Sequence, residues 1–268
     1  ETDVIFALRK DKEIMKALRL LLLFLIFSIG TVLANDNYTF RLIDTTNGLP
    51  DNEVRAFFTL PDGRWGVRSS AGISFFDGCE FHSFPPMSDD AYKLDYVSSL
   101  PYVYVDAKGI VWVKEPGRLF AFDLKKEVYR RDFKQLFLSM GVKEAIRDIY
   151  VDDAKDYWLI TTTNKLLYSH ERKIVRVPVH TKGLKDICRM GSQAWLVYRD
   201  GLMVHLDVKT NRVLNTLRLW QGNVPERDFV HFSKAGNHLW VMWKHGVAYY
   251  NQSARQWKQL YADGQNTL

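Results

Sequence analysis

The chain has 268 residues, a formal net charge of +6 and 14% aromatic residues. This length is enough to bury a sizeable core, and all-β chains of this size often form one domain. Lys and Arg alternate with Asp and Glu along the whole sequence, so no block of positive charge forms and no nucleic-acid partner is expected. The two cysteines, Cys79 and Cys188, lack metal-ligand spacing, which indicates two separate thiols, with a long-range disulfide after export as the alternative.

Residues 15–34 have the pattern of a secretory signal peptide. A basic start at Met15 precedes about ten strongly apolar residues at 20–29, and small residues precede a cleavage site after Ala34. The apolar run is shorter than the roughly 20 residues that a membrane-spanning helix needs, so we expect cleavage, with an uncleaved anchor as the alternative. Residues 1–14 are highly charged and start with Glu, and we interpret them as an upstream segment that is not native. The protein is therefore predicted to be exported to the periplasm.

Five copies of one pattern fill residues 35–268. Each copy has an apolar strand, a polar turn, a tryptophan, and further apolar strands separated by turns. The tryptophans are Trp65, Trp112, Trp158, Trp195 and Trp240, at spacings of 47, 46, 37 and 45 residues. A repeat of this length with four short strands is typical of a propeller blade. The sequence therefore predicts an all-β fold, a β-propeller, with one helical turn within 136–143 and blades at about 44–84, 92–133, 142–179, 183–219 and 227–261.

The repeated tryptophans have two alternative roles, which are packing between neighbouring blades and stacking against a ligand. A tryptophan that recurs once in each blade fits the first role, because sheets that face each other need large apolar side chains and one indole buries a large area. We therefore predict that all five tryptophans are structural residues of the repeat.

The first repeat carries several short motifs in a fixed order. They are Gly48-Leu49-Pro50-Asp51-Asn52-Glu53-Val54, Asp62-Gly63-Arg64-Trp65-Gly66-Val67-Arg68, Gly72-Ile73 and Phe76-Asp77-Gly78. This order closely resembles the two-component regulator propeller repeat, in which Gly-Leu-small-x-Asn-x-Val precedes an acidic-Gly turn, Trp-x-Gly-Thr, Gly-Leu and aromatic-Asp-Gly. The resemblance is specific over residues 38–84 and degenerate afterwards, and in place of Trp-x-Gly-Thr this chain has Trp65-Gly66-Val67-Arg68.

Proteins of this family form the periplasmic sensors of hybrid two-component systems and related sensor histidine kinases, especially in Bacteroides-like bacteria. The resemblance implies an extracellular ligand, such as a carbohydrate, and a link through a β-sandwich and one membrane helix to a cytoplasmic histidine kinase outside this chain. It leaves a homodimer open. The alternatives to a sensor are a secreted propeller enzyme, such as a lyase or hydrolase, and a non-catalytic adhesion or scaffold propeller.

The number of blades is a separate expectation. Family members have about seven blades in a ring, and propellers in general have four to eight. We therefore expect the five repeats to be part of a larger ring. The alternative is a smaller ring, in which residues 38–43 supply the strand that completes the last blade.

No catalytic or metal-binding motif occurs in the sequence. The nucleophile elbow, phosphate loop, dinucleotide fingerprint and His-Glu-x-x-His are absent, so this chain is predicted to be non-catalytic, with no cofactor and no metal site. In an antiparallel blade, the loop before the inner strand and the turn between the second and third strands lie on one face, around the mouth of the central channel. Basic groups there favour an anionic or hydroxyl-rich ligand. The predicted ligand-binding residues at this mouth are Asp51, Asn52, Arg55, Arg68, Glu115, Arg147, Arg199 and Lys244.

Overall fold

The computed structural model describes residues 19, 42–94, 102–171, 173–225, 228–235, 238–251 and 253–262. The chain divides into two compact units, Glu1–Ile43 and Asp44–Leu268, and the described strands all belong to the second. Apart from Arg19, the predicted signal peptide and the segment before it lie outside the described residues. Within the described part of the chain, no helix is both long and apolar enough to cross a bilayer.

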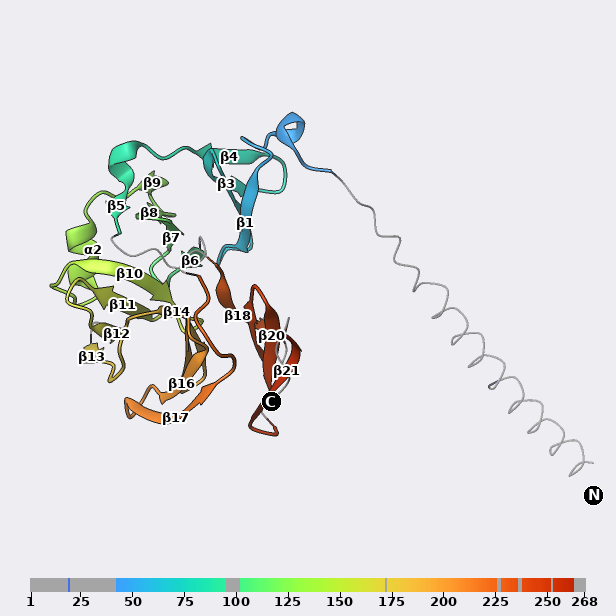
Figure 1. The fold of residues 1–268 in the computed structure, drawn as a ribbon. Helices are drawn as coiled ribbons and strands as arrows, with labels where there is room; N and C mark the ends of the chain where they lie inside the picture. Colours follow the sequence, from blue (N-terminus) through green and yellow to red (C-terminus); the bar gives the residue numbers. More distant parts are fainter. Residues whose placement is uncertain are drawn as a thin grey trace, which may run out of the picture. The chain divides into compact units, whose positions relative to one another are not determined.

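Asp44–Leu268 forms a β-propeller of five antiparallel blades that follow one another along the chain (Figure 1). In blades 1, 3, 4 and 5, the order of the four strands in the sheet is their order in the sequence. Blade 2 differs at its outer edge, where two short strands, β5 and β9, both pair with β8. The predicted all-β propeller fold is confirmed.

Consecutive segments of the sequence form the five blades. Blade 1 contains β1 (Val54–Thr59), β2 (Trp65–Ser69), β3 (Gly72–Phe76) and β4 (Phe81–Phe84). Blade 2 contains β5 (Tyr92–Lys93), β6 (Tyr102–Val105), β7 (Ile110–Glu115), β8 (Arg118–Asp123) and β9 (Val128–Tyr129). Blade 3 contains β10 (Ile146–Val151), β11 (Tyr157–Thr161), β12 (Leu166–His170) and β13 (Lys173–Arg176). Blade 4 contains β14 (Leu184–Met190), β15 (Gln193–Tyr198), β16 (Leu202–Asp207) and β17 (Arg212–Arg218). Blade 5 contains β18 (Val230–Ala235), β19 (His238–Trp243), β20 (Gly246–Asn251) and β21 (Gln256–Ala262).

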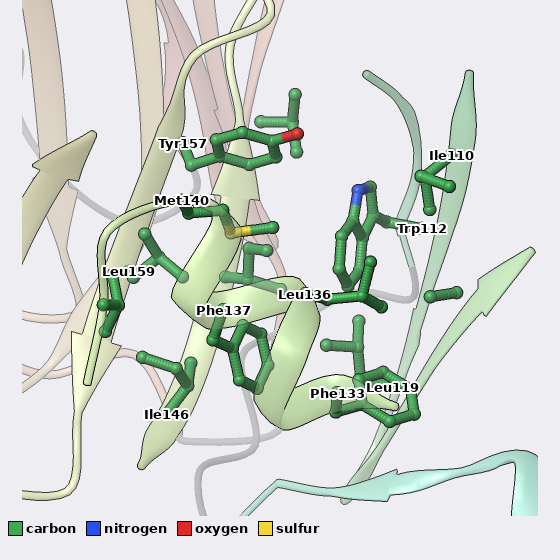
Figure 2. Packing of buried hydrophobic residues seen from close by; sticks show 14 of the residues in the cluster. Ile110, Trp112, Leu119, Phe133, Leu136, Phe137, Met140, Ile146, Tyr157 and Leu159 are labelled. Atoms are coloured by element: carbon green, nitrogen blue, oxygen red, sulfur yellow. The ribbon is translucent and has the colours of Figure 1, made fainter. Parts of the chain in front are cut away.

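Three short helices complete the described structure: the 3-10 helices η1 (Thr45–Asn47) and η2 (Ser88–Asp90), and α2 (Phe133–Ser139). Helix α2 lies between blades 2 and 3 within one buried cluster (Figure 2). Trp112 is fully buried there and stacks on Phe137 of the helix, with ring centres 6.4 Å apart. The helix begins at Phe133, three residues before the helical turn that the sequence predicts.

In blades 2 and 3, the turn after the inner strand holds a buried aspartate that binds the indole of the following tryptophan. Asp106 accepts a hydrogen bond from Trp112 Nε1 at 2.8 Å, and its other oxygen accepts two backbone N–H groups of the turn. Asp152 accepts one from Trp158 Nε1 at 3.0 Å in the same way. Because a buried indole N–H needs an acceptor, the aspartate six residues before the tryptophan orients the ring and also closes the turn.

Three of the five tryptophans are buried between consecutive blades. Trp112 joins blade 2 to blade 3, Trp158 joins blade 3 to blade 4, and Trp195 joins blade 4 to blade 5. Trp240 takes the same register in blade 5 as Trp195 in blade 4, but it is half-buried and packs on Tyr249 of its own blade at 5.1 Å.

Trp65 departs from the expected packing. The inner hairpin pairs Phe58 with Gly66 in blade 1 and Tyr104 with Trp112 in blade 2, so Gly66 occupies the repeat position. Strand side chains alternate between faces, and this offset of one residue turns Trp65 away from blade 2 and leaves 47% of it exposed. Thus Trp65 does not pack between two of the five blades.

Two substitutions in blade 1 compensate for the missing tryptophan. Phe58 fills the space, since a Cβ atom on Gly66 would lie 2.3 Å from the Phe58 ring. Leu60, six residues before Gly66, takes the place of the indole-binding aspartate and is buried. With no indole N–H to satisfy, the turn needs no buried acceptor there.

The free face of blade 1 carries a row of aromatic side chains. Trp65 contacts Phe57 at 5.6 Å and stacks on Phe76 at 6.0 Å, and Phe76 contacts Phe81 at 4.9 Å. Phe57 is 61% exposed. Blade 1 therefore presents an apolar face that the described residues leave open.

Blade 5 supplies its own outermost strand. β21 pairs with β20 from Gly246 to Asn251. The outer position in the last blade, which residues 38–43 would fill in the smaller-ring alternative, is therefore occupied by the chain's C-terminal strand. Residues 38–41 lie outside the described residues.

Candidate ligand-binding site

A cavity of about 350 Å³ lies where the inner strands of four blades meet. β6 of blade 2, the end of β10 of blade 3, β14 of blade 4 and β18 of blade 5 form its walls. We refer to it as the central cavity, lined by Tyr102, Tyr104, Val151, Asp152, Asp153, Asp186, Ile187, Cys188, Arg189, His231, Phe232, Ser233 and Lys234.

One buried carboxylate ties three of these blades together. Asp186 of blade 4 accepts hydrogen bonds from the backbone N–H groups of Ile187 and Phe232, each at 2.8 Å. The same carboxylate lies 2.8 Å from His231 Nδ1 of blade 5 and accepts a longer bond, at 3.3 Å, from the hydroxyl of Tyr102 of blade 2. Four partners satisfy a carboxylate buried at this depth, so the position of each strand depends on the others.

His231 is held by one side of its ring. Its Nδ1 atom lies 2.7 Å from the Tyr102 hydroxyl as well as 2.8 Å from Asp186. Both contacts use Nδ1, and no contact of Nε2 with another described residue accompanies them. Nε2 is therefore the atom with which this cavity-lining imidazole is able to bind a ligand.

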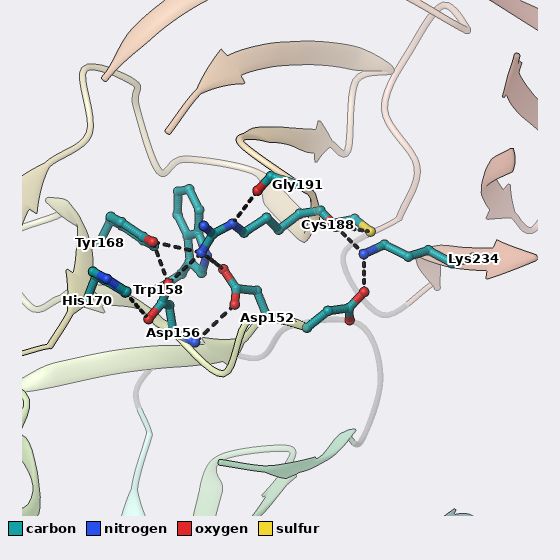
Figure 3. A network of polar contacts seen from close by, with 10 residues as sticks. Asp152, Asp156, Trp158, Tyr168, His170, Cys188, Gly191 and Lys234 are labelled. Carbon is teal, nitrogen blue, oxygen red and sulfur yellow. Dashed lines mark hydrogen bonds and ion pairs between the residues drawn. The ribbon is translucent and has the colours of Figure 1, made fainter. Parts of the chain in front are cut away.

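A second network surrounds Arg189 at the end of β14 (Figure 3). The guanidinium donates to Asp152 at 3.3 Å, to Asp156 at 2.5 Å and to the Tyr168 hydroxyl at 2.8 Å. Burial raises the pKa of Asp156, but hydrogen bonds from Tyr168, His170 and Arg189 outweigh burial and bring that pKa below its usual range. This network connects blade 4 to blade 3 through charges that are already paired.

Lys234 closes the cavity from blade 5. Its ammonium group binds the carboxylate of Asp153 in blade 3 and the backbone carbonyl of Arg189 in blade 4 (Figure 3). Asp153 is well exposed, so this ion pair is accessible to solvent and contributes little to stability. It is a contact that a ligand is able to replace at low cost.

The cavity contains one thiol, which is not activated. Burial raises the pKa of Cys188 to about 12, so the thiol stays protonated at neutral pH. Cys188 and the exposed Cys79 are both free and lie in different blades. No disulfide joins them, which agrees with the prediction of two separate thiols.

A buried ion pair lies beside the cavity. Lys114 of blade 2 contacts Asp148 of blade 3 at 2.8 Å, and its ammonium lies 3.9 Å from the centre of the Tyr150 ring. Both charged side chains are almost fully buried. Removing one partner would leave an uncompensated charge, so we assign this pair to the junction of blades 2 and 3 rather than to ligand binding.

The residues that the sequence predicts as ligand-binding lie elsewhere. Arg68 and Glu115 form a buried ion pair that joins blades 1 and 2, and Arg118 also contacts Glu115. Arg147 donates to Asn164 within blade 3, and Lys244 lies 3.3 Å from Asp228. None of the eight predicted residues lines the central cavity.

The other three predicted residues of blade 1, apart from Arg68, mainly organise the segment at the start of β1. Asp51 accepts the backbone N–H of Glu53, and Asn52 accepts that of Thr45. Arg55 pairs with Glu53 at 3.1 Å. Arg199 lines a second hollow, at the opposite end of β14 from the cavity.

Sequence reasoning missed the cavity residues because they lie within strands and tight turns. The search for charged loop residues passed over Tyr102, Asp186 and His231, which come from three different repeats. A signal was present, since aspartates close the inner hairpins of blades 2 and 3. One of them, Asp152, lines the cavity directly after β10.

One group of potential metal ligands occurs among the described side chains. Asp77, Glu80 and His82 lie on the exposed hairpin between β3 and β4, with their ligand atoms within 4.8 Å of one another. Asp77 already accepts the backbone N–H groups of Cys79 and Glu80, which fold this turn. Asp77 therefore has a structural role in this turn.

The fold has relatives among solved structures. No family model matches the sequence, and no curated protein matches it either. The extracellular domain of the putative hybrid two component system BT4673 from B. thetaiotaomicron superposes with a TM-score of 0.54 at 14% identity, over 88% of this chain and 32% of that chain. The corresponding domain of BT3049 from the same organism gives 0.53 at 15% identity, over 83% and 32%.

The chain has the propeller fold of these extracellular domains. This finding confirms, at the level of the fold, the resemblance that the first repeat shows. PorZ of Porphyromonas gingivalis, a surface component of the type-IX secretion system, gives a TM-score of 0.52 at 10% identity, over 83% of this chain and 29% of PorZ. The chain spans about a third of the length of each of these three matched chains.

Proposed function

We propose that this chain is the exported, ligand-sensing propeller region of a bacterial two-component signalling receptor. The observation that carries the proposal is the central cavity, whose walls come from four of the five blades. The propeller fold shared with extracellular domains of two-component systems supports it. In this proposal the region lies in the periplasm, and a histidine kinase outside the chain supplies the catalytic activity.

The position of the cavity supports a sensing mechanism. A ligand that contacts β6, β10, β14 and β18 together favours the one arrangement of blades in which all four contacts form. Asp186 and Lys234 already connect three blades each across this space. Binding there shifts the relative positions of the blades, and this shift is the signal that a linked transmitter would detect.

The lining favours a neutral, hydroxyl-rich ligand such as a short oligosaccharide. Tyr102 and Tyr104 stack with ring centres 5.5 Å apart and offer an aromatic surface. The hydroxyls of Tyr104 and Ser233 have no hydrogen-bond partner among the described residues, and burial raises the pKa of Tyr104, so its hydroxyl stays protonated as a donor. The charged groups of the cavity are mostly paired, which disfavours a highly charged ligand.

Further blades of the same polypeptide would complete the ring in this proposal, giving about seven in total. The aromatic row of blade 1 and the half-buried Trp240 of blade 5 support it, since the matching faces of the inner blades are covered by a neighbour. A sheet face of this kind gains stability from burial.

The gene beyond codon 268 provides the first test. We expect further blades, a membrane helix and a histidine-kinase sequence in the same reading frame. A reading frame that ends without a membrane helix and a transmitter would contradict the sensor proposal and favour a secreted or surface propeller.

A further inference from the structure

The hollow around Arg199 differs in chemistry from the central cavity. It has a volume of about 560 Å³ and is lined by His180, Lys182, Gly183, Arg199, Asp200 and Asn223. The backbone N–H of Arg199 donates to the carbonyl of Gly183 at 2.8 Å, just before β14 begins. The central cavity lies at the other end of β14, beside Arg189. The two spaces therefore open at opposite ends of blade 4.

Arg199 is fixed in place by its backbone and its stem. Besides the bond to Gly183, the carbonyl of Arg199 accepts the N–H of Val224 at 2.7 Å. The aliphatic stem lies directly over Gly183, where an added Cβ would be 3.0 Å from Cγ and 3.2 Å from Cδ of Arg199. Gly183 has a φ of +76°, which favours glycine, so the close approach depends on this residue. The backbone and the base of the Arg199 side chain are thus positioned before any ligand arrives.

The positive charge of the hollow is not neutralised. The side chains of Arg199 and Lys182 form no hydrogen bond or ion pair with any residue that the structure describes. Asp200 lies in the hollow but pairs with Arg218 at 3.0 Å. By contrast, Arg189 in the same blade contacts two carboxylates. The hollow therefore holds an unpaired guanidinium and an unpaired ammonium, which together attract a negative charge.

The surrounding groups add further contacts. The ring of His180 packs on Tyr198 with centres 4.5 Å apart, and the Tyr198 hydroxyl donates to the His180 carbonyl at 2.8 Å. Asn223 lines the hollow from the loop that leads to blade 5. An imidazole and a side-chain amide beside the two cations are suited to the remaining oxygen atoms of an anionic ligand.

We propose that this hollow binds an oxyanion, a carboxylate, sulfate or phosphate group, through Arg199 and Lys182. The planar guanidinium offers two parallel N–H donors that match the two oxygens of such a group, and Lys182 adds a second positive charge. The site is separate from the central cavity and does not depend on the sensing function proposed for it.

Titration of the whole chain with four probes tests this site. The probes are inorganic sulfate, inorganic phosphate, glucuronate and uncharged glucose, followed by calorimetry and NMR at low ionic strength. We expect the anions to bind and glucose to bind far more weakly at this site. Tighter binding of glucuronate than of sulfate and phosphate would identify the carboxylate of a sugar acid, and the reverse order would identify a free tetrahedral anion.

Three variants distinguish a specific anion site from nonspecific attraction of anions to the positively charged surface. Arg199→Gln is expected to weaken anion binding about tenfold or more, since it removes charge-assisted hydrogen bonds. Gly183→Ala should also weaken it, because the new Cβ displaces the stem of Arg199. Arg212→Gln is the matched control, since Arg212 is an exposed cation of the same blade at the start of β17.

Two results would overturn the proposal. One is equal anion affinity in the wild type, Arg199→Gln and Arg212→Gln, which would mean an adventitious ion only. The other is no binding of any of the three anions to the wild type. His231→Gln in the central cavity should leave anion binding unchanged, so failure of the sensing proposal remains distinguishable from failure of this one. Thermal melting of each variant confirms that it is folded.

Discussion

Blades 1 and 3 fill the space beside the next blade with different side chains. In blade 3, Trp158 is buried against blade 4 and Asp152 accepts its indole N–H. In blade 1, Gly66 and Leu60 occupy these two positions, and Phe58 fills the space. Blade 1 carries the sequence motifs that resemble a known repeat, while the more degenerate blade 3 keeps the tryptophan in its packing position. Motif likeness and packing role are therefore separate properties of a repeat.

Truncating the tryptophans should show the largest difference between these blades. Trp158→Ala is expected to lower the free energy of unfolding by about 3–5 kcal/mol, because it opens a cavity between two sheets. Trp65→Ala should cost less than about 1 kcal/mol in this chain, since nearly half of the side chain is exposed. Chemical denaturation of both variants measures the two values. Equal losses would contradict the assignment of Gly66, rather than Trp65, to the repeat position.

Blades 1 and 3 also show how much of this structure the sequence predicts. The spacing of turns and tryptophans was sufficient for the propeller, because every blade repeats its strands at a similar interval. The role of Trp65 was not predictable from spacing alone, since an offset of one residue changes the face of a strand. Alignment by the turns reveals the offset, because Asp106 and Asp152 stand six residues before a tryptophan and Leu60 stands six before Gly66.

The candidate site was less accessible from sequence. The sequence predicts Arg199 as a ligand-binding residue because it is a basic residue between the second and third strands of its blade, and the structure places it in the hollow of blade 4. Asp186, His231 and Tyr102 come from strands far apart in the sequence, and their meeting depends on how the blades are arranged. Conversely, Arg68 and Glu115 were predicted to bind a ligand but pair with each other across two blades. Charge in a sequence does not reveal which charges are neutralised by folding.

Substitution of the indole-binding aspartate in blade 2 should cause the next largest loss of stability. Asp106→Asn is expected to cost about 2–3 kcal/mol. One oxygen of Asp106 accepts from Trp112 Nε1 and the Tyr157 hydroxyl, and the other accepts two backbone N–H groups, so an amide NH2 in place of either oxygen leaves two donors without an acceptor. Denaturation in urea measures the loss. The exposed Asp62 of blade 1 accepts no indole, so Asp62→Asn serves as the control and should cost much less.

Filling the glycine position of blade 1 should lower the stability by a smaller amount. Gly66→Ala places a Cβ within 2.3 Å of the Phe58 ring, and we expect a loss of about 1–2 kcal/mol. In Phe58→Ala the space is open, so adding Gly66→Ala to that variant should cost little or restore stability. A double-mutant cycle measures this coupling. Additive losses would show that Phe58 does not fill the place of the missing indole.

The acid sensitivity of blade 3 should be the smallest effect. The pKa of Asp156 is lower in the folded state than its ordinary value of 3.8, so its stabilising contribution is present above that value and is lost as pH falls through the lower, folded pKa. Below about pH 4, the free energy of unfolding should therefore depend less steeply on pH in Asp156→Asn than in the wild type. An unchanged pH dependence would show that the Arg189 network does not hold Asp156 ionised.

Hydrogen exchange in the presence of neutral di- and trisaccharides tests the sensing account most directly. The account predicts that at least one of these sugars slows exchange in β6, β10, β14 and β18 together, and that His231→Ala abolishes the effect while Arg212→Gln does not. Protection confined to one blade, protection that persists in His231→Ala, or no binding by any sugar of the panel would contradict the central cavity as the sensing site.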